Sequence, residues 1–429
     1  MSRPTPILAP ALLALACAVA LGACQRTAPP AADANATATP AADATPAAAE
    51  PAAPTQRTAA TDLEQLAERI VTQTAGVKEG EVVFISGQMH DAELLENLAV
   101  QVRKVGAFPL ITYSSDRLSK RLFFDVPEKY DTQVDTAGMK LASLVDVNIS
   151  VGNQLTQDLF VDADPARMAA RGKAGEAVSN AFVKEGLRVV DIGNGLYPTP
   201  WRAERFGLGE DALAKTFWEG VNVDYTQLQA RADQVKAALA SGDAMQITNP
   251  NGTDLKLRIG GRKVMASDGI ISADDVKQGG GALMVYLPAG EVYTTPVSGT
   301  AEGKVVHSRT YYQGKEVTDL TMTFAGGKLT AVTGAGDGFA AWKAAYDAVT
   351  DPRKNEFAFV DFGINPNVTL PAGAKVGNWV PAGSVTVGMG GNAWAGGSNT
   401  VPNTVEAFLP GSTVTLDGKP IVENGVLKL

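Results

Sequence analysis

The sequence predicts an α/β amino-terminal domain with an open, mostly parallel sheet, then a mostly antiparallel β domain, with a cleft between the two. Over residues 59–242, apolar runs of strand length alternate with amphipathic runs of helical period. Over residues 243–429, short β-rich runs follow one another and glycine-rich turns separate them. At 429 residues and 45% hydrophobic content, the chain can bury a large core.

The amino terminus is predicted to be a secretion signal over residues 1–23. Arg3 precedes an apolar segment, residues 7–20, that is too short to remain as a membrane-spanning helix. Leu21-Gly22-Ala23-Cys24 resembles the lipobox of bacterial lipoproteins, which implies cleavage before Cys24 and lipidation of its thiol. We therefore expect a cell-envelope protein that meets the membrane through its lipid anchor only. Gln25 after the cysteine favours the outer membrane, with the protein facing the periplasm.

Residues 24–58 combine the lipidated cysteine with an Ala-, Pro- and Thr-rich stretch that cannot bury a core, so we expect a disordered tether. Because Cys17 leaves with the signal and Cys24 carries lipid, no thiol remains for a disulfide or a thiolate metal site. The net charge of −9 argues against nucleic acid as a partner.

The α/β domain is predicted to begin with a helix over residues 63–74, capped at Thr61-Asp62. Strands are expected at 82–85, 109–113, 145–151 and 187–192, and helices at 92–105, 136–144 and 167–184. This alternation implies parallel strands with right-handed crossovers and a ligand crevice at their carboxyl ends. Residues 86–90 form no phosphate-binding pattern, so no nucleotide site is assigned.

Residues 197–241 are predicted to be helical, and the β domain begins near Met245, with one helix at 339–349. Within it, residues 281–300 contain two β-type runs around Pro288-Ala289-Gly290, which we expect to form a hairpin that presents Glu291. A carboxylate at a strand–turn junction suits a metal ligand or a general base. The alternative is an ordinary solvated glutamate.

Four stretches of the second half resemble motifs of the thermophilic metallo-aminopeptidase family: L-P-A-G-E-V-Y-T-T-P at 287–296, F-G-I-N-P at 362–366, G-S-V-T-V-G-M-G-G-N at 383–392 and G-G-S-N at 396–399. Their order and spacing cover most of residues 245–429. The resemblance implies peptides as substrates, a homodimer, and two divalent metals held by two Glu, two His and one Asp with an assisting Tyr.

Transferred to this chain, the resemblance implies a reduced ligand set. Glu291 matches the first Glu and Asp361 aligns with the second, so both are candidate metal ligands, and Glu291 is the candidate catalytic base. The other ligand positions hold residues without imidazole or carboxylate: Thr386, Asn403 and Val405. The expected cleft residues are Trp394, the aromatic nearest to the assisting Tyr, with Asn392, Gly396 and Gly397. His90 and His307 match no ligand position.

Two functions stay open. In the first, the protein is a tethered envelope member of this family with a lost or reduced di-metal centre, and it acts by binding peptides or another envelope component. In the alternative, it is an active metallo-aminopeptidase that releases N-terminal residues from peptides in the periplasm. Zinc, cobalt, magnesium or manganese is the metal in question, or none, because a pair of ions needs more anionic or imidazole ligands than Glu291 and Asp361. A different hydrolase or an oxygenase on the same fold is a third hypothesis, against which the lack of a two-His-one-carboxylate set counts.

Overall fold

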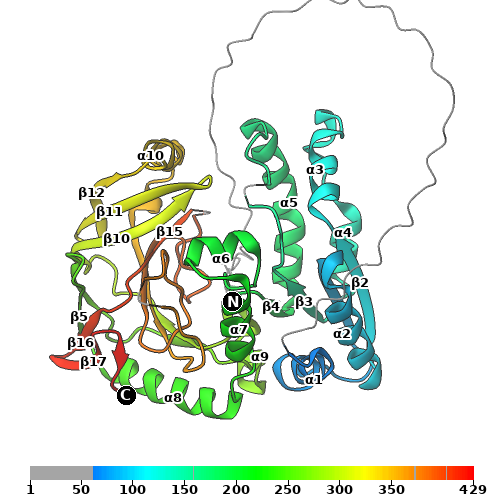
Figure 1. The fold of residues 1–429 in the computed structure, drawn as a ribbon, viewed down its shortest axis with the longest axis horizontal. Helices are drawn as coiled ribbons and strands as arrows, with labels where there is room; N and C mark the ends of the chain where they lie inside the picture. The colour runs from blue at the N-terminus through cyan, green and yellow to red at the C-terminus, as the bar shows by residue number, and fades with distance from the viewer. Residues whose placement is uncertain (1–60, 158, 372, 402) are drawn as a thin grey trace, which may run out of the picture.

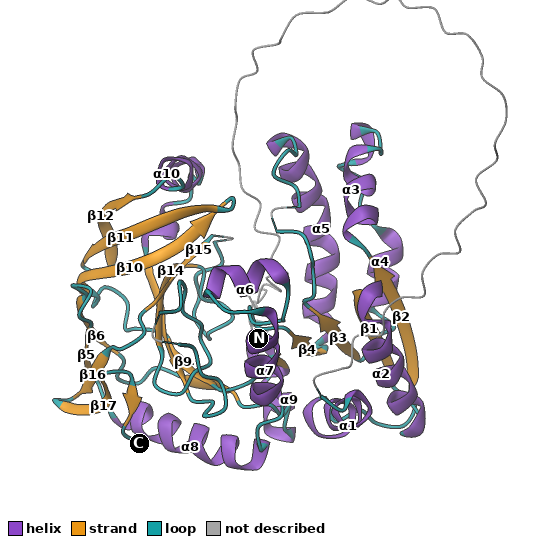
Figure 2. Cartoon of the chain, viewed as in Figure 1, coloured by secondary structure: helices purple, strands orange, loops and turns teal. Residues whose placement is uncertain are grey.

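The structure, a computed structural model, describes residues 61–157, 159–371, 373–401 and 403–429. The predicted signal, the lipidated Cys24 and the tether lie outside these residues. The described residues form three sheets with helices packed around them, as Figures 1 and 2 show. Among them, no helix is both long enough and apolar enough to cross a bilayer.

The first sheet, sheet A, has the strand order β2-β1-β3-β4-β8, and neighbouring strands in it run parallel. Its strands are β1 (Val82–Gln88), β2 (Phe108–Ser114), β3 (Val147–Val151), β4 (Arg188–Ile192) and β8 (Met284–Leu287). One row across it joins Ile85, Ile149, Val190 and Val285, all buried, so the β-type apolar runs form the core. The predicted parallel sheet is confirmed, but its fifth strand comes from beyond residue 243.

Helices pack around sheet A and between it and the rest of the fold, whereas α8 (Tyr225–Ser241) lies along the antiparallel half (Figure 1). They are α1 (Leu63–Arg69), α2 (Ala92–Lys104), α3 (Asp116–Phe124), α4 (Thr136–Ala142), α5 (Pro165–Glu185), α6 (Pro200–Phe206), α7 (Glu210–Val221) and α8 (Tyr225–Ser241). Asp62 caps α1 by accepting the N–H of Gln65, as expected, and the helix continues as a π-helical turn, Ile70–Thr74. Single 3₁₀ turns lie at Met89–Asp91 and Glu128–Tyr130.

The remaining strands form two antiparallel sheets. Sheet B has the order β12-β11-β10-β6-β5-β16-β17-β18, and sheet C has the order β15-β14-β13-β9-β7. Sheet B contains β5 (Ala244–Thr248), β6 (Asp254–Arg258), β10 (Glu302–Tyr312), β11 (Lys315–Ala325), β12 (Lys328–Ala335), β16 (Thr413–Leu416), β17 (Lys419–Glu423) and β18 (Val426–Leu427). Sheet C contains β7 (Val264–Ser267), β9 (Glu291–Thr294), β13 (Phe357–Gly363), β14 (Val385–Gly390) and β15 (Thr404–Phe408). Short helices α9 (Ala273–Gln278) and α10 (Phe339–Ala348) and 3₁₀ turns at Gly280–Leu283 and Pro352–Asn355 complete this half.

The hairpin expected around Pro288-Ala289-Gly290 is wrong. Strand β8 pairs with β4 in sheet A, whereas β9 pairs with β13 and β7 in sheet C. The turn is fixed to sheet C, because the N–H of Gly290 donates to Ser267 and the N–H of Ile364 donates to Gly290. Gly290 has φ 130°, and a Cβ there would lie 2.6 Å from Cβ of Asn365, so only glycine fits this crossing. Glu291 therefore lies where the parallel and antiparallel parts of the molecule join.

A carboxylate face at the junction of the sheets

One face of sheet C gathers most of the predicted site residues. The register places Asp361 of β13 opposite Thr386 of β14 on one side and opposite Tyr293 of β9 on the other. Side chains two residues apart on a strand share a face, so Glu291 lies on the same face as Tyr293. The structure thus brings Glu291, Asp361 and Thr386 together, although they are far apart in the sequence.

Glu406, which none of the sequence motifs predicted as a site residue, also lies on this face. It pairs with Gly388 of β14, which is two residues from Thr386, so its side chain lies on the Asp361 side of the sheet. Val405, where the resemblance placed an Asp equivalent, pairs with Met389 and points to the opposite face. Asn403 precedes the strand, and its carbonyl accepts the N–H of Gly391. The sequence shows an acidic residue one position after Val405, but only the strand register places that residue on this face. We call the surface that carries Glu291, Asp361, Thr386 and Glu406 the carboxylate face.

Polar groups on the carboxylate face are buried with few partners. Asp361 is 1% exposed, and neither of its carboxylate oxygens has a hydrogen-bond partner among the described residues. The Thr386 hydroxyl is likewise buried without one in the described part of the chain. Glu291 is 5% exposed, and its Oε1 accepts a 2.5 Å hydrogen bond from Nδ2 of Asn194. Buried polar atoms without partners are costly, so water or a bound group would stabilise Asp361 and Thr386 by supplying the missing hydrogen bonds.

Burial and mutual repulsion raise the pKa values of these acids. Burial is the largest cause of the raised pKa of Asp361, and the charges of Glu291 and Glu406 add to it. Burial also raises the pKa of Glu291, against which the hydrogen bond from Asn194 acts. The pKa of Glu406 rises to about 7 because its carboxyl group is enclosed, although the residue as a whole is partly exposed. No positively charged group of the described residues lowers the pKa values of these acids, so a cation bound here would be favoured.

Aromatic rings enclose the carboxylate face. The Trp394 ring lies 4.9 Å from that of Tyr293 and 4.8 Å from that of Phe359, measured between centroids, and Trp379 packs 6.0 Å from Phe359. Trp394 therefore lies beside the carboxylates, next to Tyr293. Burial is also the largest cause of the raised pKa of Tyr293, so its hydroxyl stays protonated.

The other expected cleft residues shape the loop that carries Trp394. The Asn392 side chain connects the loop to β13 and closes the loop on itself. Its Nδ2 donates to the Ala358 carbonyl, and its Oδ1 accepts the N–H of Asn399. A Cβ on Gly397 would lie 2.1 Å from Oδ1 of Asn392, so the glycine is needed for close packing. Gly396 has φ 80° and packs against Met265. These residues hold the loop over sheet C.

Neither histidine completes a metal site. His307 of β10 packs 5.9 Å from the Phe408 ring, and burial lowers its pKa to about 4, so it is neutral. His90 follows β1 and lies 3.2 Å from the carboxylate of Asp91, which also accepts the Tyr197 hydroxyl. In the ranges that the structure describes, no three His, Cys, Asp or Glu residues lie close enough to hold one metal ion.

The residues of the carboxylate face do not fit a two-metal centre. Paired transition-metal ions require several imidazole or carboxylate ligands, and this face offers oxygen donors alone, without three of them converging. Uncompensated buried carboxylates do fit a single positively charged group. Oxygen donors favour hard cations, and an ammonium group surrounded by aromatic rings is the organic equivalent.

Comparisons with known proteins give a family and a fold. Residues 59–348 match the model of the family described as "Thermophilic metalloprotease (M29)". The matched range includes Glu291 and ends before Asp361, Thr386 and Glu406. The chain is 25% identical over 308 residues to aminopeptidase PepS of Streptococcus thermophilus, a similarity that covers 63% of this chain and 70% of that protein.

Two solved structures share the fold. Wild-type AmpT from Thermus thermophilus has a TM-score of 0.65 at 16% identity, covering 86% of this chain and 99% of that one. The 2,5-dihydroxypyridine dioxygenase of Pseudomonas putida KT2440 has a TM-score of 0.52 at 14% identity, covering 85% of this chain and 96% of that one. Both likenesses concern the fold alone, which they confirm, and a fold shared by proteins of such different names does not decide the reaction.

Proposed function

Because this chain belongs to the thermophilic metalloprotease (M29) family, we propose that it acts on the amino-terminal ends of peptides, which meet the carboxylate face. The observation that carries this proposal is the buried carboxyl group of Asp361, whose two oxygens have no hydrogen-bond partners among the described residues. The α-ammonium group of a peptide supplies a positive charge and hydrogen-bond donors for such a carboxylate. Trp394 and Tyr293 add ring faces that favour a cation.

Release of the amino-terminal residue is the reaction that family membership and the name of the similar aminopeptidase support. A family of metalloproteases is typically dependent on divalent metal, which polarises a peptide carbonyl and acidifies water when bound. In this chain, Asp361 and Glu406 hold the ammonium end. Glu291, kept in place by Asn194, is the group available to accept a proton from water.

Binding without hydrolysis is the second candidate function. It is favoured by Thr386, which occupies the position where the resemblance implies an imidazole ligand, and by the lack of three converging ligands in the described residues. A protein of this kind would hold peptide ends in the envelope without cleaving them.

The two functions separate in one experiment on the purified full chain in detergent. Peptides with free amino ends are assayed for release of their first residue and for binding, with and without a chelator, and metal content is measured by mass spectrometry. Hydrolysis that Glu291→Gln abolishes supports the enzyme, and binding without release supports the second candidate. A protein that neither binds nor cleaves such peptides contradicts the proposal. Glu68→Gln, an exposed glutamate on α1, is the matched control.

The lipid anchor, the envelope location and the homodimer remain predictions from the sequence. Support for the anchor comes from Leu21-Gly22-Ala23-Cys24 and from the tether composition of residues 24–58. Labelling of cells with a fatty-acid probe tests it, because Cys24→Ser is expected to abolish the label and release the protein from membranes. A labelled Cys24→Ser protein would exclude this attachment site.

A further inference from the structure

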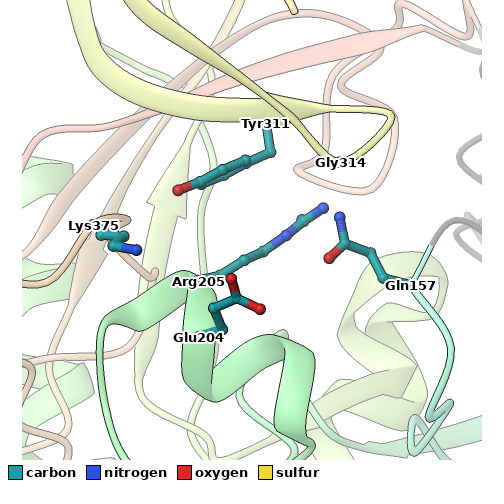
Figure 3. Close-up of a pocket in the computed structure, with 6 residues that line it drawn as sticks. All are labelled: Gln157, Glu204, Arg205, Tyr311, Gly314 and Lys375. Atoms are coloured by element: carbon teal, nitrogen blue, oxygen red, sulfur yellow. The ribbon is translucent and has the colours of Figure 1, made fainter.

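A second polar site lies between α6 and the turn that joins β10 to β11. It is a pocket of about 380 Å³ lined by Gln157, Glu204, Arg205, Tyr311, Gly314 and Lys375 (Figure 3). None of the acids of the carboxylate face lines it. Its walls come from both halves of the molecule, since α6 follows sheet A and β10 belongs to sheet B.

Positive charge and hydrogen-bond donors dominate this pocket. Arg205 and Lys375 carry positive charges, and Glu204 carries the negative one. The Arg205 guanidinium lies 5.0 Å from the ring centroid of Tyr311 and 5.0 Å from that of Trp201, so stacking on two rings fixes it. In Figure 3 the Lys375 ammonium and the Tyr311 hydroxyl point toward one another on one side, and Arg205 and Gln157 lie together on the other. An anionic group is the complementary ligand.

One connection of the chain carries groups of both sites. The segment that leaves β4 contains Asn194, which binds Glu291, and continues into α6, which carries Glu204 and Arg205. Strand β10 likewise contacts sheet C through His307 and Phe408 and carries Tyr311 of the pocket. A negative site and a positive site therefore lie along the same joint between the halves. A peptide has a positive amino end and carries carboxylate groups further along its chain.

We propose that this pocket binds a carboxylate group of the peptide whose amino end meets the carboxylate face, an inference that rests on the proposed function. The carboxylate is that of the peptide's carboxyl terminus or of an acidic side chain, and both offer the same chemistry to Arg205 and Lys375. The pocket would then make the protein select short or acidic peptides.

Three peptides test this proposal on the full chain in detergent by calorimetry: Ala-Ala-Ala, its carboxyl-terminal amide, and the amide of Ala-Ala-Glu. We expect the free acid, the Glu peptide or both to bind more tightly than the Ala-Ala-Ala amide, by about fivefold, the upper range for partly exposed charge pairs. Preference for the free acid identifies the terminal carboxylate, and preference for the Glu peptide identifies the side chain.

Variants that remove a positive or a negative charge from the pocket test whether the pocket causes this preference, because the two changes should act in opposite directions. Lys375→Gln is expected to remove it, and Glu204→Gln, which deletes the negative charge, is expected to increase it by about twofold. Lys419→Gln, an exposed lysine on β17, is the matched control and is expected to leave it unchanged. Lys375 and Glu204 are both exposed, so neither change removes a buried group.

The results separate this inference from the proposed function. Equal binding of the three peptides contradicts the proposal that the pocket binds a carboxylate, and it leaves the proposed function unaffected. Binding of the acidic peptides alone, with no detectable binding of the Ala-Ala-Ala amide and no effect of Glu291→Gln, supports the pocket and contradicts the carboxylate face. Failure of every peptide to bind overturns both.

Discussion

Asp131, beside α5, and Asp361, on sheet C, are two aspartates with little exposure and opposite surroundings. Asp131 accepts 2.6 Å hydrogen bonds from Nε of Arg167 and from Nε of Arg171. The hydrogen bond from Arg167 is the main cause that lowers its pKa to about 2. Asp361 has neither a cation nor a hydrogen-bond partner in the described part of the chain, and burial raises its pKa. Residue type is therefore a poor guide to what a buried carboxylate does.

The difference lies in what each region supplies from its own chain. The two arginines at Asp131 also lie over the Phe123 ring, at 4.9 Å and 4.6 Å, so charge, hydrogen bonds and stacking are satisfied together. This arrangement joins α5 to the segment after α3 and leaves nothing for a ligand. The carboxylate face supplies rings and further acids, but no cation. An incomplete site of this kind gains free energy when a positive group binds.

The largest expected difference between the two aspartates is their effect on affinity for peptide amino ends. Asp361→Asn keeps the shape and removes the charge, so affinity for peptide amino ends should fall by about a hundredfold, as for loss of a buried charged partner. Asp131→Asn should leave that affinity unchanged, because its carboxylate faces arginines and not the ligand. Calorimetry with one tripeptide measures both. Equal losses in the two variants would refute the contrast.

The second expected difference concerns how the free energy of unfolding depends on pH. Groups with a raised pKa bind more protons in the folded than in the unfolded state, so the free energy of unfolding falls as pH rises through their folded pKa values. In chelator-treated protein we expect a loss on the order of 2 kcal/mol from about pH 6.5 to about pH 8.5, from Glu291 and Glu406, whose pKa values burial raises to about 7. The neutral His307 adds no slope there, because its pKa is lowered to about 4 and its contribution is lost only as pH falls.

Variants and cations identify the source of this slope in chemical denaturation. Glu291→Gln and Glu406→Gln should each reduce it, and Glu68→Gln should leave it as in the wild type. Added Mg²⁺ or Mn²⁺ should raise the stability at the high-pH end in the wild type if a hard cation binds. A slope that persists when both glutamates are replaced would mean that other groups cause it.

A smaller effect is expected at Asp131, with the opposite dependence on pH. Its lowered pKa contributes stability that is present above the unfolded pKa and is lost as pH falls toward about 2. Asp131→Asn should therefore lower the melting temperature at neutral pH and weaken the acid dependence. In this variant, amide hydrogen exchange should become faster in α5 than in the wild type, and it should change less in β13. Unchanged exchange in α5 would show that the arginine pair does not stabilise the helix.

Sequence patterns predicted the elements better than the site. The alternation of apolar runs identified sheet A, and the motif spacing singled out Glu291, Asp361, Thr386 and Trp394, which the structure places around one face. Glu406 was missed because the motif position was read at Asn403 and Val405, and a shift of one residue along a strand reverses the face. No local feature of residues 403–406 reveals that register, which pairing with β14 sets.

By itself, the sequence determined the elements of the fold, since hydrophobic period and turn residues act locally, and it determined that Glu291 follows a turn. Only the tertiary structure decided that this turn passes the chain from sheet A to sheet C, and that Glu291 consequently lies at their junction. It alone decided which acids are buried together and that arginines satisfy Asp131 but not Asp361. Desolvation and charge pairing depend on residues distant in the chain, so they become definite only when the sheets pack.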